Sequence, residues 1–460
     1  MLGSRRARDG AVIAAVALAA RLAVVAWAAG KFPPAADGTY YHAIATRLAE
    51  GAGYTWVWPD GAVTYAAHYP IGYPATLAAL YAVFGAKPVV AMILHAVLGA
   101  LGTFAIHRLA WPMMTPRRAL AAGLVVALHP ALVPYTAALM TEAVTAAWLA
   151  IACALAAEAR ASERAWKWRA LAGIVMGIAT LTRPQVLVLA PLLGVLSTRE
   201  IKAYPRVVSA IAVTAITVAC CLPWTARNCV RMHRCALVSV NAGWNLLIGE
   251  ETESGGWGEI QVPETCREVW DEAAKDACFE RAARERIAAS PGRWLSKIPT
   301  KLSVTFDYFG AAPWYLHTSN AAAFPESAKL VLGVVETVVS RILLVAALLV
   351  SVGAAGARSK PRVALALLGV AFAVTSHGWV ALLVLALLTA LVPLRAEDSP
   401  LLPWTVAVIV ATAITHAAFF GAGRYGLVVV PFVSALAFLP PRTTSPSPDK
   451  MSFKNSSSSG

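Results

Sequence analysis

Charged residues are scarce in this chain of 460 residues, because Asp, Glu, Lys and Arg together make up only 14% of it. Hydrophobic residues reach 58%, and the mean hydropathy is +0.62. So little charge excludes a string of water-soluble domains and is typical of an integral membrane protein.

The long apolar stretches also lack the two-residue alternation of polar and apolar side chains that marks a membrane β-barrel. Unpaired backbone groups are not tolerated in lipid, so these stretches should be helices, each of roughly 20 residues. We therefore expect an all-α integral membrane protein with about twelve transmembrane helices. The expected crossings lie near residues 11–30, 88–107, 118–134, 137–157, 168–182, 184–198, 206–223, 330–356, 361–375, 377–394, 401–420 and 425–440.

Acidic residues are fewer than basic ones, 25 against 39, which gives a formal charge of +14. The basic residues gather in short connections such as "GSRRARDG", "TPRRA" and "EARASERAWKWR", which fall on alternate turns of this count. By the positive-inside rule, both termini should be cytoplasmic. The topology and contact with membrane lipids are then enough to explain the positive charge. The charge gives no reason to expect a nucleic acid partner.

With this topology, two large non-cytoplasmic loops, at about residues 31–87 and 223–329, face the periplasm or the cell exterior. Residues 1–440 should form one multipass domain in the inner (plasma) membrane, and the Pro/Ser-rich residues 441–460 a disordered cytoplasmic tail. A cleaved signal peptide is the alternative for the N-terminus, but Arg21 interrupts its apolar core. In a membrane helix, Arg21 should face the bundle interior or a wet cavity.

Four of the seven cysteines fall in the second large loop, at Cys229, Cys235, Cys266 and Cys278. In an exported loop they suit disulfides, for which three connectivities are open. A zinc site that includes His233 is the alternative, although the spacings are not those of common zinc motifs.

Eight motifs, in this order and with this sidedness, resemble the C-type glycosyltransferase (GT-C) superfamily. They are "DGTYYHAIATRLAEGAGY", "HYPIGYPATLAALYAVFG", "TEAV", "TRP", "PWTARN", "VNAGWNLLIGE", "SGGW" and "HAAFFGAGRYGLVVVP". The likeness covers residues 11–440 and is greatest to the bacterial branch related to protein mannosyltransferases and the lipid A aminoarabinose transferase. It implies transfer of a sugar from a polyprenyl-phosphate donor to an acceptor on the outer face, with an aspartate of the first large loop as catalytic base.

Asp37 is the residue in the position of that aspartate. A carboxylate that takes the proton of an acceptor hydroxyl during attack on the anomeric carbon lowers the barrier, and one base suffices for an inverting displacement. The alternative role for Asp37 is to cap the helix that follows. The chain departs from the family pattern at Gly38, where the family often has a second acid, and at "HYPIGYP", where it often has "PPGYP".

The departing phosphate needs positive charge near the interface, which arginine supplies with a bidentate fork. Three arginines are expected on the outer face, Arg183, Arg227 and Arg424. Each could instead be an interfacial anchor. The family likeness favours Arg424 and Arg183 as contacts to the donor phosphate.

Further residues are expected to line the substrate cavity: Tyr40, Tyr41, His68, Glu142 and Tyr425. Glu142 could simply favour the first turn of its helix, or could bind a divalent metal with His68 or His42. No clustered "DxD" motif is present, so the sequence leaves a metal cofactor undecided. The simpler interpretation of His416 is a histidine inside the helix bundle with its hydrogen bonds satisfied, rather than a residue of the cavity wall.

The sequence therefore predicts an inverting glycosyltransferase of the cell envelope that uses a polyprenyl-phosphate-linked sugar and a lipid, glycan or protein acceptor. A multipass transporter or a lipid-linked sugar flippase is the alternative. No internal six-helix repeat supports a transporter. Neither the sugar, hexose or pentose, nor the acceptor follows from these motifs.

Overall fold

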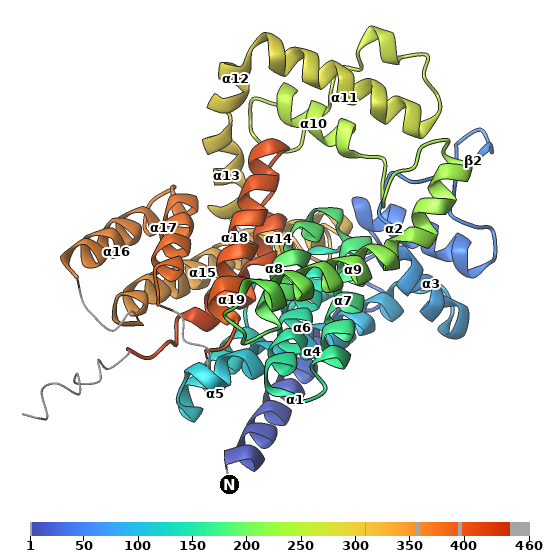
Figure 1. The fold of residues 1–460 in the computed structure, drawn as a ribbon. Helices are drawn as coiled ribbons and strands as arrows, with labels where there is room; N and C mark the ends of the chain where they lie inside the picture. The colour runs from blue at the N-terminus through green and yellow to red at the C-terminus, as the bar shows by residue number, and fades with distance from the viewer. Residues whose placement is uncertain (1, 309, 355–358, 394–397, 442–460) are drawn as a thin grey trace, which may run out of the picture.

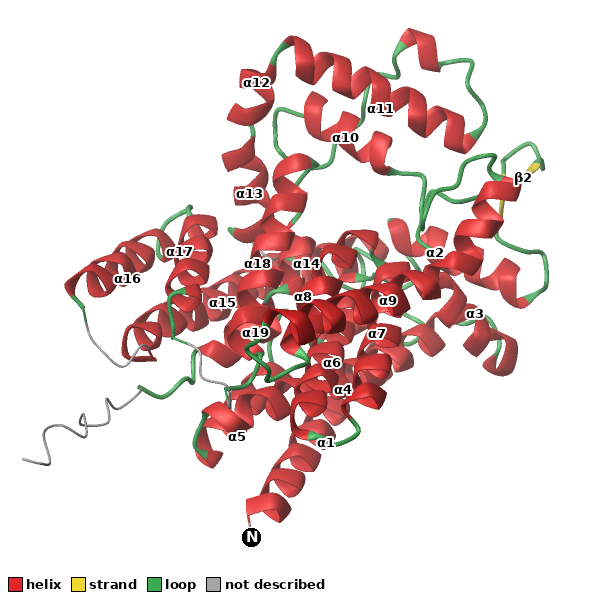
Figure 2. Ribbon diagram, viewed as in Figure 1, coloured by secondary structure: helices red, strands yellow, loops and turns green. Residues whose placement is uncertain are grey.

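A computed structural model describes residues 2–308, 310–354, 359–393 and 398–441. Helices dominate these residues, and one short two-stranded sheet is the exception to the all-helical pattern among them (Figure 2). The predicted all-α fold class is confirmed. The predicted disordered tail lies outside the described residues apart from Pro441.

The N-terminal half of the bundle and the first large loop contain ten of the elements. They are α1 (Leu2–Ala28), α2 (Asp37–Ala49), β1 (Thr55–Val57), β2 (Val63–Tyr65), α3 (Gly72–Phe84), α4 (Pro88–Ala110), α5 (Pro116–Ala127), α6 (Glu142–Ala161), α7 (Ala165–Thr182) and α8 (Ala190–Leu196). Short 3₁₀ turns lie at η1 (Trp111–Met113), η2 (Pro134–Ala137) and η3 (Pro184–Leu189).

The second half starts with a helix that leaves the bundle and enters the second large loop. Its helices are α9 (Ala203–Arg231), α10 (Ala242–Glu251), α11 (Glu272–Ala289), α12 (Pro291–Ser296), α13 (Ile298–Phe306), α14 (Ala311–Ser319), α15 (Glu326–Ala354), α16 (Lys360–Ala373), α17 (Gly378–Ala390), α18 (Leu401–Ala418) and α19 (Val430–Leu436). Its 3₁₀ turns are η4 (Glu264–Cys266) and η5 (Gly423–Val428).

Six helices of the described residues are long and apolar enough to cross a membrane, namely α1, α4, α6, α9, α15 and α18. The chain is thus a multipass membrane protein. Other expected crossings are shorter or broken, because Pro184 and the 3₁₀ turn η3 precede α8, and η5 precedes α19. The total of about twelve crossings stays a prediction.

Close helix packing in the bundle depends on small residues. A Cβ on Gly102 of α4 would lie 2.8 Å from the Cα of Ala147 on α6, so these two helices approach more closely there than a larger residue would allow. Helix α6 in turn packs against α7. The interior of the bundle thus holds the first turn of α6, where Glu142 lies, in a fixed position.

The two large loops lie together at the end of the bundle away from the N-terminus (Figure 1). The first contains α2, α3 and the antiparallel pair β1–β2, in register Thr55 with Tyr65. The second loop carries α10–α12. Two disulfides lie in this loop, one between Cys229 and Cys235 and one between Cys266 and Cys278. The loops are joined by hydrogen bonds from Val240 N to Ala67 O and from Ala67 N to the Glu272 carboxylate.

Candidate active site

Asp37 is the first residue of α2, and the backbone around it leaves little freedom. Ala36 has φ of 49°, in a region that residues with a Cβ rarely adopt. A Cβ on Gly38 would lie 2.8 Å from the Tyr315 hydroxyl and 3.0 Å from the Leu139 carbonyl oxygen. A second acid at this position, which the family often has, would not fit here.

The two oxygens of the Asp37 carboxylate have different neighbours. Oδ2 lies 2.8 Å from Nη2 of Arg424, while Oδ1 accepts a long hydrogen bond of 3.4 Å from the Tyr69 hydroxyl. Burial, and then the charge of Asp37, raise the pKa of Tyr69, so this hydroxyl keeps its proton and donates it. The Asp37 side chain is still 32% exposed, so a substrate can reach it.

Arg424 comes from η5, which follows α18, and reaches across to a second acid. Its Nε lies 3.4 Å from Oε1 of Glu142, whose side chain is only 2% exposed. The same Oε1 receives Nη1 of Arg183 at 2.8 Å. Glu142 is therefore a buried anchor that holds two guanidinium groups side by side.

Other polar groups complete the coordination of this anchor. Tyr135 donates from its hydroxyl to Oε2 of Glu142 at 2.7 Å, and Arg183 also donates to Oγ1 of Thr141 at 3.2 Å. Three contacts, from Arg183, Arg424 and Tyr135, therefore fix the buried Glu142 carboxylate in place.

The Tyr425 ring packs against the guanidinium groups of both arginines. Cζ of Arg183 and Cζ of Arg424 lie 5.0 and 5.1 Å from its ring centroid, and His416 stacks on the Tyr425 ring at 4.1 Å between ring centroids. Burial alone would lower the pKa of Arg424, but Tyr425, Asp37 and Glu142 raise it above the ordinary value. The guanidinium therefore remains charged at every relevant pH.

Taken together, the four charged groups Asp37, Glu142, Arg183 and Arg424 have a formal sum of zero. A phosphate that entered would find two forked cations already oriented, and one of them, Arg424, paired with a carboxylate that is partly exposed. The arrangement suits a reaction that needs an anion site and a base next to each other.

Arg227 is the expected phosphate ligand that the structure does not bring to this cluster. Its guanidinium donates to the carbonyl oxygens of Ala66 and Tyr54, at 2.8 and 2.9 Å, and lies over the ring of Trp224 at 4.7 Å. These contacts tie α9 to the β1–β2 hairpin. The motif "PWTARN" contains no sequence signal that distinguishes such a structural role from phosphate binding.

The remaining expected cavity residues surround Tyr69. Tyr40 stacks on it at 5.2 Å, Tyr41 meets its edge at 5.1 Å and His68 at 4.9 Å. Burial lowers the pKa of His68 to about 4, so its imidazole is neutral near pH 7.

The expected metal ligands are occupied by other contacts. The Glu142 carboxylate holds arginines and Tyr135, and Nδ1 of His42 lies 2.9 Å from the Tyr81 hydroxyl. Within the ranges that the structure describes, no three His, Cys, Asp or Glu residues gather as a metal site would require.

Sequence reasoning missed Tyr135 and Tyr69 as parts of the site. Tyr69 lies inside the quoted motif "HYPIGYP", one residue after His68. Tyr135 lies in η2, seven residues before Glu142. Their roles depend on how α2, η2 and α6 pack, which no local pattern in the chain specifies.

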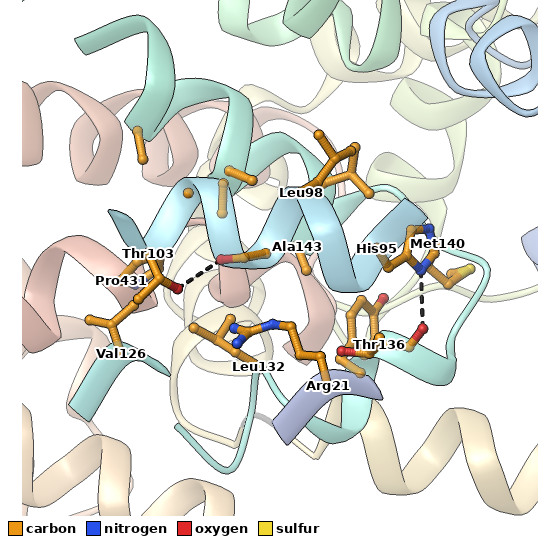
Figure 3. A pocket seen from close by; sticks show the side chains of 17 residues that line it. Arg21, His95, Leu98, Thr103, Val126, Leu132, Thr136, Met140, Ala143 and Pro431 are labelled. Atoms are coloured by element: carbon orange, nitrogen blue, oxygen red, sulfur yellow. Dashed lines mark hydrogen bonds between the residues drawn. The ribbon is translucent and has the colours of Figure 1, made fainter. Parts of the chain in front are cut away.

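A cavity of about 30 Å³ lies beneath the cluster, and Tyr135 and Met140 are part of its wall. Arg21 of α1 extends into it (Figure 3). Its Nη1 donates to the carbonyl oxygens of Ala17 and Ala127 at 3.1 and 3.0 Å. Arg21 thus faces the bundle interior and a cavity large enough for one water, as its position in a membrane helix predicted.

Comparison with known proteins gives one sequence match and several structural ones. Residues 68–225 match the model of the family described as dolichyl-phosphate-mannose-protein mannosyltransferase. The comparison with curated proteins found no match.

Among solved structures, the chain is similar to the Archaeoglobus fulgidus oligosaccharyltransferase. For its apo form the identity is 14% and the TM-score 0.49, over 94% of this chain and 50% of that one. For the same enzyme, AglB, in complex with an inhibitory peptide and a dolichol-phosphate, the identity is 14% and the TM-score 0.46. This match covers 94% of this chain and 50% of that one. The chain thus spans about half the length of these oligosaccharyltransferases.

A second similar structure is ArnT from Cupriavidus metallidurans bound to undecaprenyl phosphate. It is 14% identical with a TM-score of 0.40, over 93% of this chain and 77% of that one. The family match alone confirms the resemblance that the motifs indicated, and it does so for residues 68–225, which carry the sequence pattern of the dolichyl-phosphate-mannose-protein mannosyltransferase family.

Proposed function

We propose that the chain is an inverting glycosyltransferase that moves a sugar from a polyprenyl-phosphate donor to an acceptor hydroxyl. The observation that carries this proposal is the pair formed by Asp37 and Arg424, in which a partly exposed carboxylate touches a guanidinium that Glu142 already holds. The family match and the names of the similar structures, which include a dolichol-phosphate and undecaprenyl phosphate, support the donor class.

Arg424 and Arg183 bind the donor phosphate in this proposal. Binding has an electrostatic consequence, because the phosphate competes with Asp37 for Arg424. Separating the two charges costs on the order of 4 kcal/mol in a partly exposed site, and a phosphate contact returns a similar amount. Donor binding therefore releases the carboxylate close to the anomeric carbon.

The released Asp37 then acts as general base. The acceptor oxygen forms a bond to the anomeric carbon, the bond from that carbon to the phosphate oxygen breaks, and the phosphate leaves with the electron pair. Asp37 takes the acceptor proton. A single displacement inverts the anomeric configuration.

The site should face the periplasm or the cell exterior. Helix α2 lies at the end of the bundle that carries both large loops (Figure 1). Its first residue, Asp37, contacts Arg424 and Tyr69, and the short basic connections are expected at the other end. Such a site would modify envelope lipids, glycans or proteins without access to cytoplasmic nucleotide sugars.

The test uses the full chain in lipid nanodiscs and a panel of undecaprenyl-phosphate monosaccharides with radiolabelled hexoses and pentoses. We expect release of undecaprenyl phosphate from at least one donor in the presence of a membrane extract as acceptor source. We also expect a product whose anomeric configuration is opposite to that of the donor. Retention of configuration, or no turnover of any donor, would overturn the proposal.

A further inference from the structure

Three aromatic rings form a continuous surface next to Asp37, and we call Tyr40, Trp56 and Tyr69 the aromatic platform. The Tyr40 ring lies 4.9 Å from the Trp56 ring, at an interplanar angle of 35°, and 5.2 Å from the Tyr69 ring, at 24°. Rings at these distances and angles overlap face to face, so the three form one stacked apolar block, of which Tyr40 is the exposed member, 40% exposed.

Three different segments supply the rings. Tyr40 comes from α2, three residues after Asp37 and hence on the same side of that helix. Trp56 is the middle residue of β1, and Tyr69 follows the hairpin. The Tyr54 hydroxyl donates to Tyr69 O at 2.6 Å, which fixes the backbone under the platform.

Buried tyrosines pack against one side of the platform, and its Tyr40 side chain is exposed. Tyr41 is buried and meets Tyr69 edge-on at 70°, and it meets Tyr73 in the same way at 89°. Tyr40 is 40% exposed, although it is a large aromatic side chain with apolar neighbours that could have covered it. The exposed Tyr40 ring, held in this stack beside Asp37, is therefore accessible to a ligand.

The Asp37 carboxylate separates two chemical environments. Its Oδ2 faces Arg424 and the anion site, while its Oδ1 faces the Tyr69 hydroxyl and the platform. If the donor phosphate occupies the arginine side, the nucleophile must approach the base from the platform side.

Nearby cations do not belong to the platform. Arg47 donates through Nε to Oγ1 of Thr55 at 2.8 Å, and Arg227 is held by backbone carbonyls. The side chains of the platform itself carry no charge, so the platform offers a phosphorylated headgroup no ionic contact of its own. A pyranose ring fits better, because its C–H face packs on aromatic rings while its hydroxyls point outward at the rim.

We propose that the aromatic platform binds a pyranose ring of the acceptor, so that the acceptor is a carbohydrate whose hydroxyl is presented to Oδ1 of Asp37. This inference rests on the proposed function and specifies its substrate class.

The experiment measures binding without turnover, by saturation-transfer difference NMR on the full chain in nanodiscs. The probes are the methyl pyranosides of mannose, glucose, galactose and N-acetylglucosamine, and a blocked Ser-containing tripeptide. We expect saturation of the C–H protons on one face of at least one glycoside. Tyr40→Ala should lower this signal at least threefold, and Tyr40→Phe should retain it.

Trp58→Ala is the matched control, because Trp58 is an aromatic residue of the same loop, 48% exposed, and its indole N–H donates to Thr64 in its own hairpin. It should leave the signal unchanged. Trp56→Leu should behave like Tyr40→Ala, which covers the case in which the first variant misfolds.

No saturation of any glycoside, equal signals in wild type and Tyr40→Ala, or a Tyr40-dependent signal from the peptide alone would overturn the inference. Each of these results can occur while undecaprenyl-phosphate sugars are still turned over. The failure of the acceptor class is thus distinguishable from failure of the proposed transferase function.

Discussion

Arg424 shows why ion pairs of this site are unlike those on the protein surface. An exposed pair contributes at most about 1 kcal/mol to stability. Arg424 instead shares two acids, Asp37 and the 2% exposed Glu142, and rests on the ring of Tyr425. The arrangement fixes the direction of the guanidinium, which matters more for binding an anion than for folding.

Replacing Arg424 with Ala should therefore weaken binding of undecaprenyl phosphate by about 10-fold or more, since a charge-assisted contact to phosphate contributes roughly 1.5 to 3 kcal/mol. Binding can be followed by microscale thermophoresis in nanodiscs. Arg284→Ala is the control, because Arg284 is 72% exposed and pairs only with Glu280 on its own helix. Equal affinities of the two variants would remove Arg424 from the phosphate site.

The carboxyl group of Glu272, in the outer loops, should make the free energy of unfolding depend on pH. Burial raises its pKa to about 7, although it accepts a hydrogen bond from Ala67 N. The folded protein therefore keeps this proton up to about pH 7, whereas the unfolded chain loses it near the ordinary value of about 4.3. Because the folded state binds more protons in this interval, raising the pH through it lowers the free energy of unfolding.

Glu272→Gln should abolish this decrease, which amounts to at most about 3 kcal/mol. The measurement is the thermal unfolding midpoint from pH 5 to pH 8, with Glu264→Gln as control because the Glu264 side chain is 89% exposed. His68, whose pKa is lowered to about 4, acts in the opposite direction in both proteins and cancels in the comparison. Parallel curves for wild type and Glu272→Gln would show that Glu272 is ionised throughout.

Among the elements, the start of α2 is the one on which the site depends most closely. Gly38 packs against the Tyr315 hydroxyl of α14, and the same hydroxyl accepts from Ala35 N at 3.2 Å. The turn before Asp37 is thus clamped from the second large loop. A shift of this helix start would move the carboxylate relative to Arg424.

Gly38→Ala should reduce turnover by about 10- to 100-fold while the protein still folds, because displacements near 1 Å are costly to catalysis. Initial rates with the active donor measure this. Gly292→Ala is the matched control, since a Cβ at Gly292 would meet nothing within 4 Å. A Gly38→Ala enzyme with the wild-type rate would show that the position of α2 is not critical.

At this scale the sequence predicted more of the elements than of their contacts. The apolar runs gave the positions of α1, α4, α6, α9, α15 and α18, because long membrane helices are recognisable from composition alone. The sequence could not foresee that α19 would be a short helix after a 3₁₀ turn, nor that Arg227 would bind the hairpin backbone. Such contacts join distant segments and follow only from packing.

For the whole molecule, sidedness is the assumption behind every role given to the two large loops. The motifs singled out Asp37, Glu142, Arg183 and Arg424, and the structure brings these residues together although they come from four separate segments. Which compartment they face depends on the distribution of Lys and Arg, which the shape of the bundle does not reveal.

Reporter fusions measure this directly. A fluorescent reporter that folds only in the cytoplasm should give signal after Arg164, between α6 and α7, and alkaline phosphatase should be active after Gly255 in the second large loop. The physical reason is that the basic residues of the short connections resist translocation. Phosphatase activity at Arg164 would reverse the orientation and place the site in the cytoplasm.

The central claim is that Asp37 removes the acceptor proton, and Asp37→Asn tests it most directly. Asn keeps the shape of the side chain but cannot take a proton, so transfer from the active donor should fall by about 100-fold or more. Undecaprenyl phosphate should still bind, because Arg183 and Arg424 remain. Asp60→Asn, in the exposed turn of the hairpin, is the control and should transfer at the wild-type rate. A purified Asp37→Asn protein that also transferred at the wild-type rate would contradict the account and leave Asp37 as the first residue of a helix.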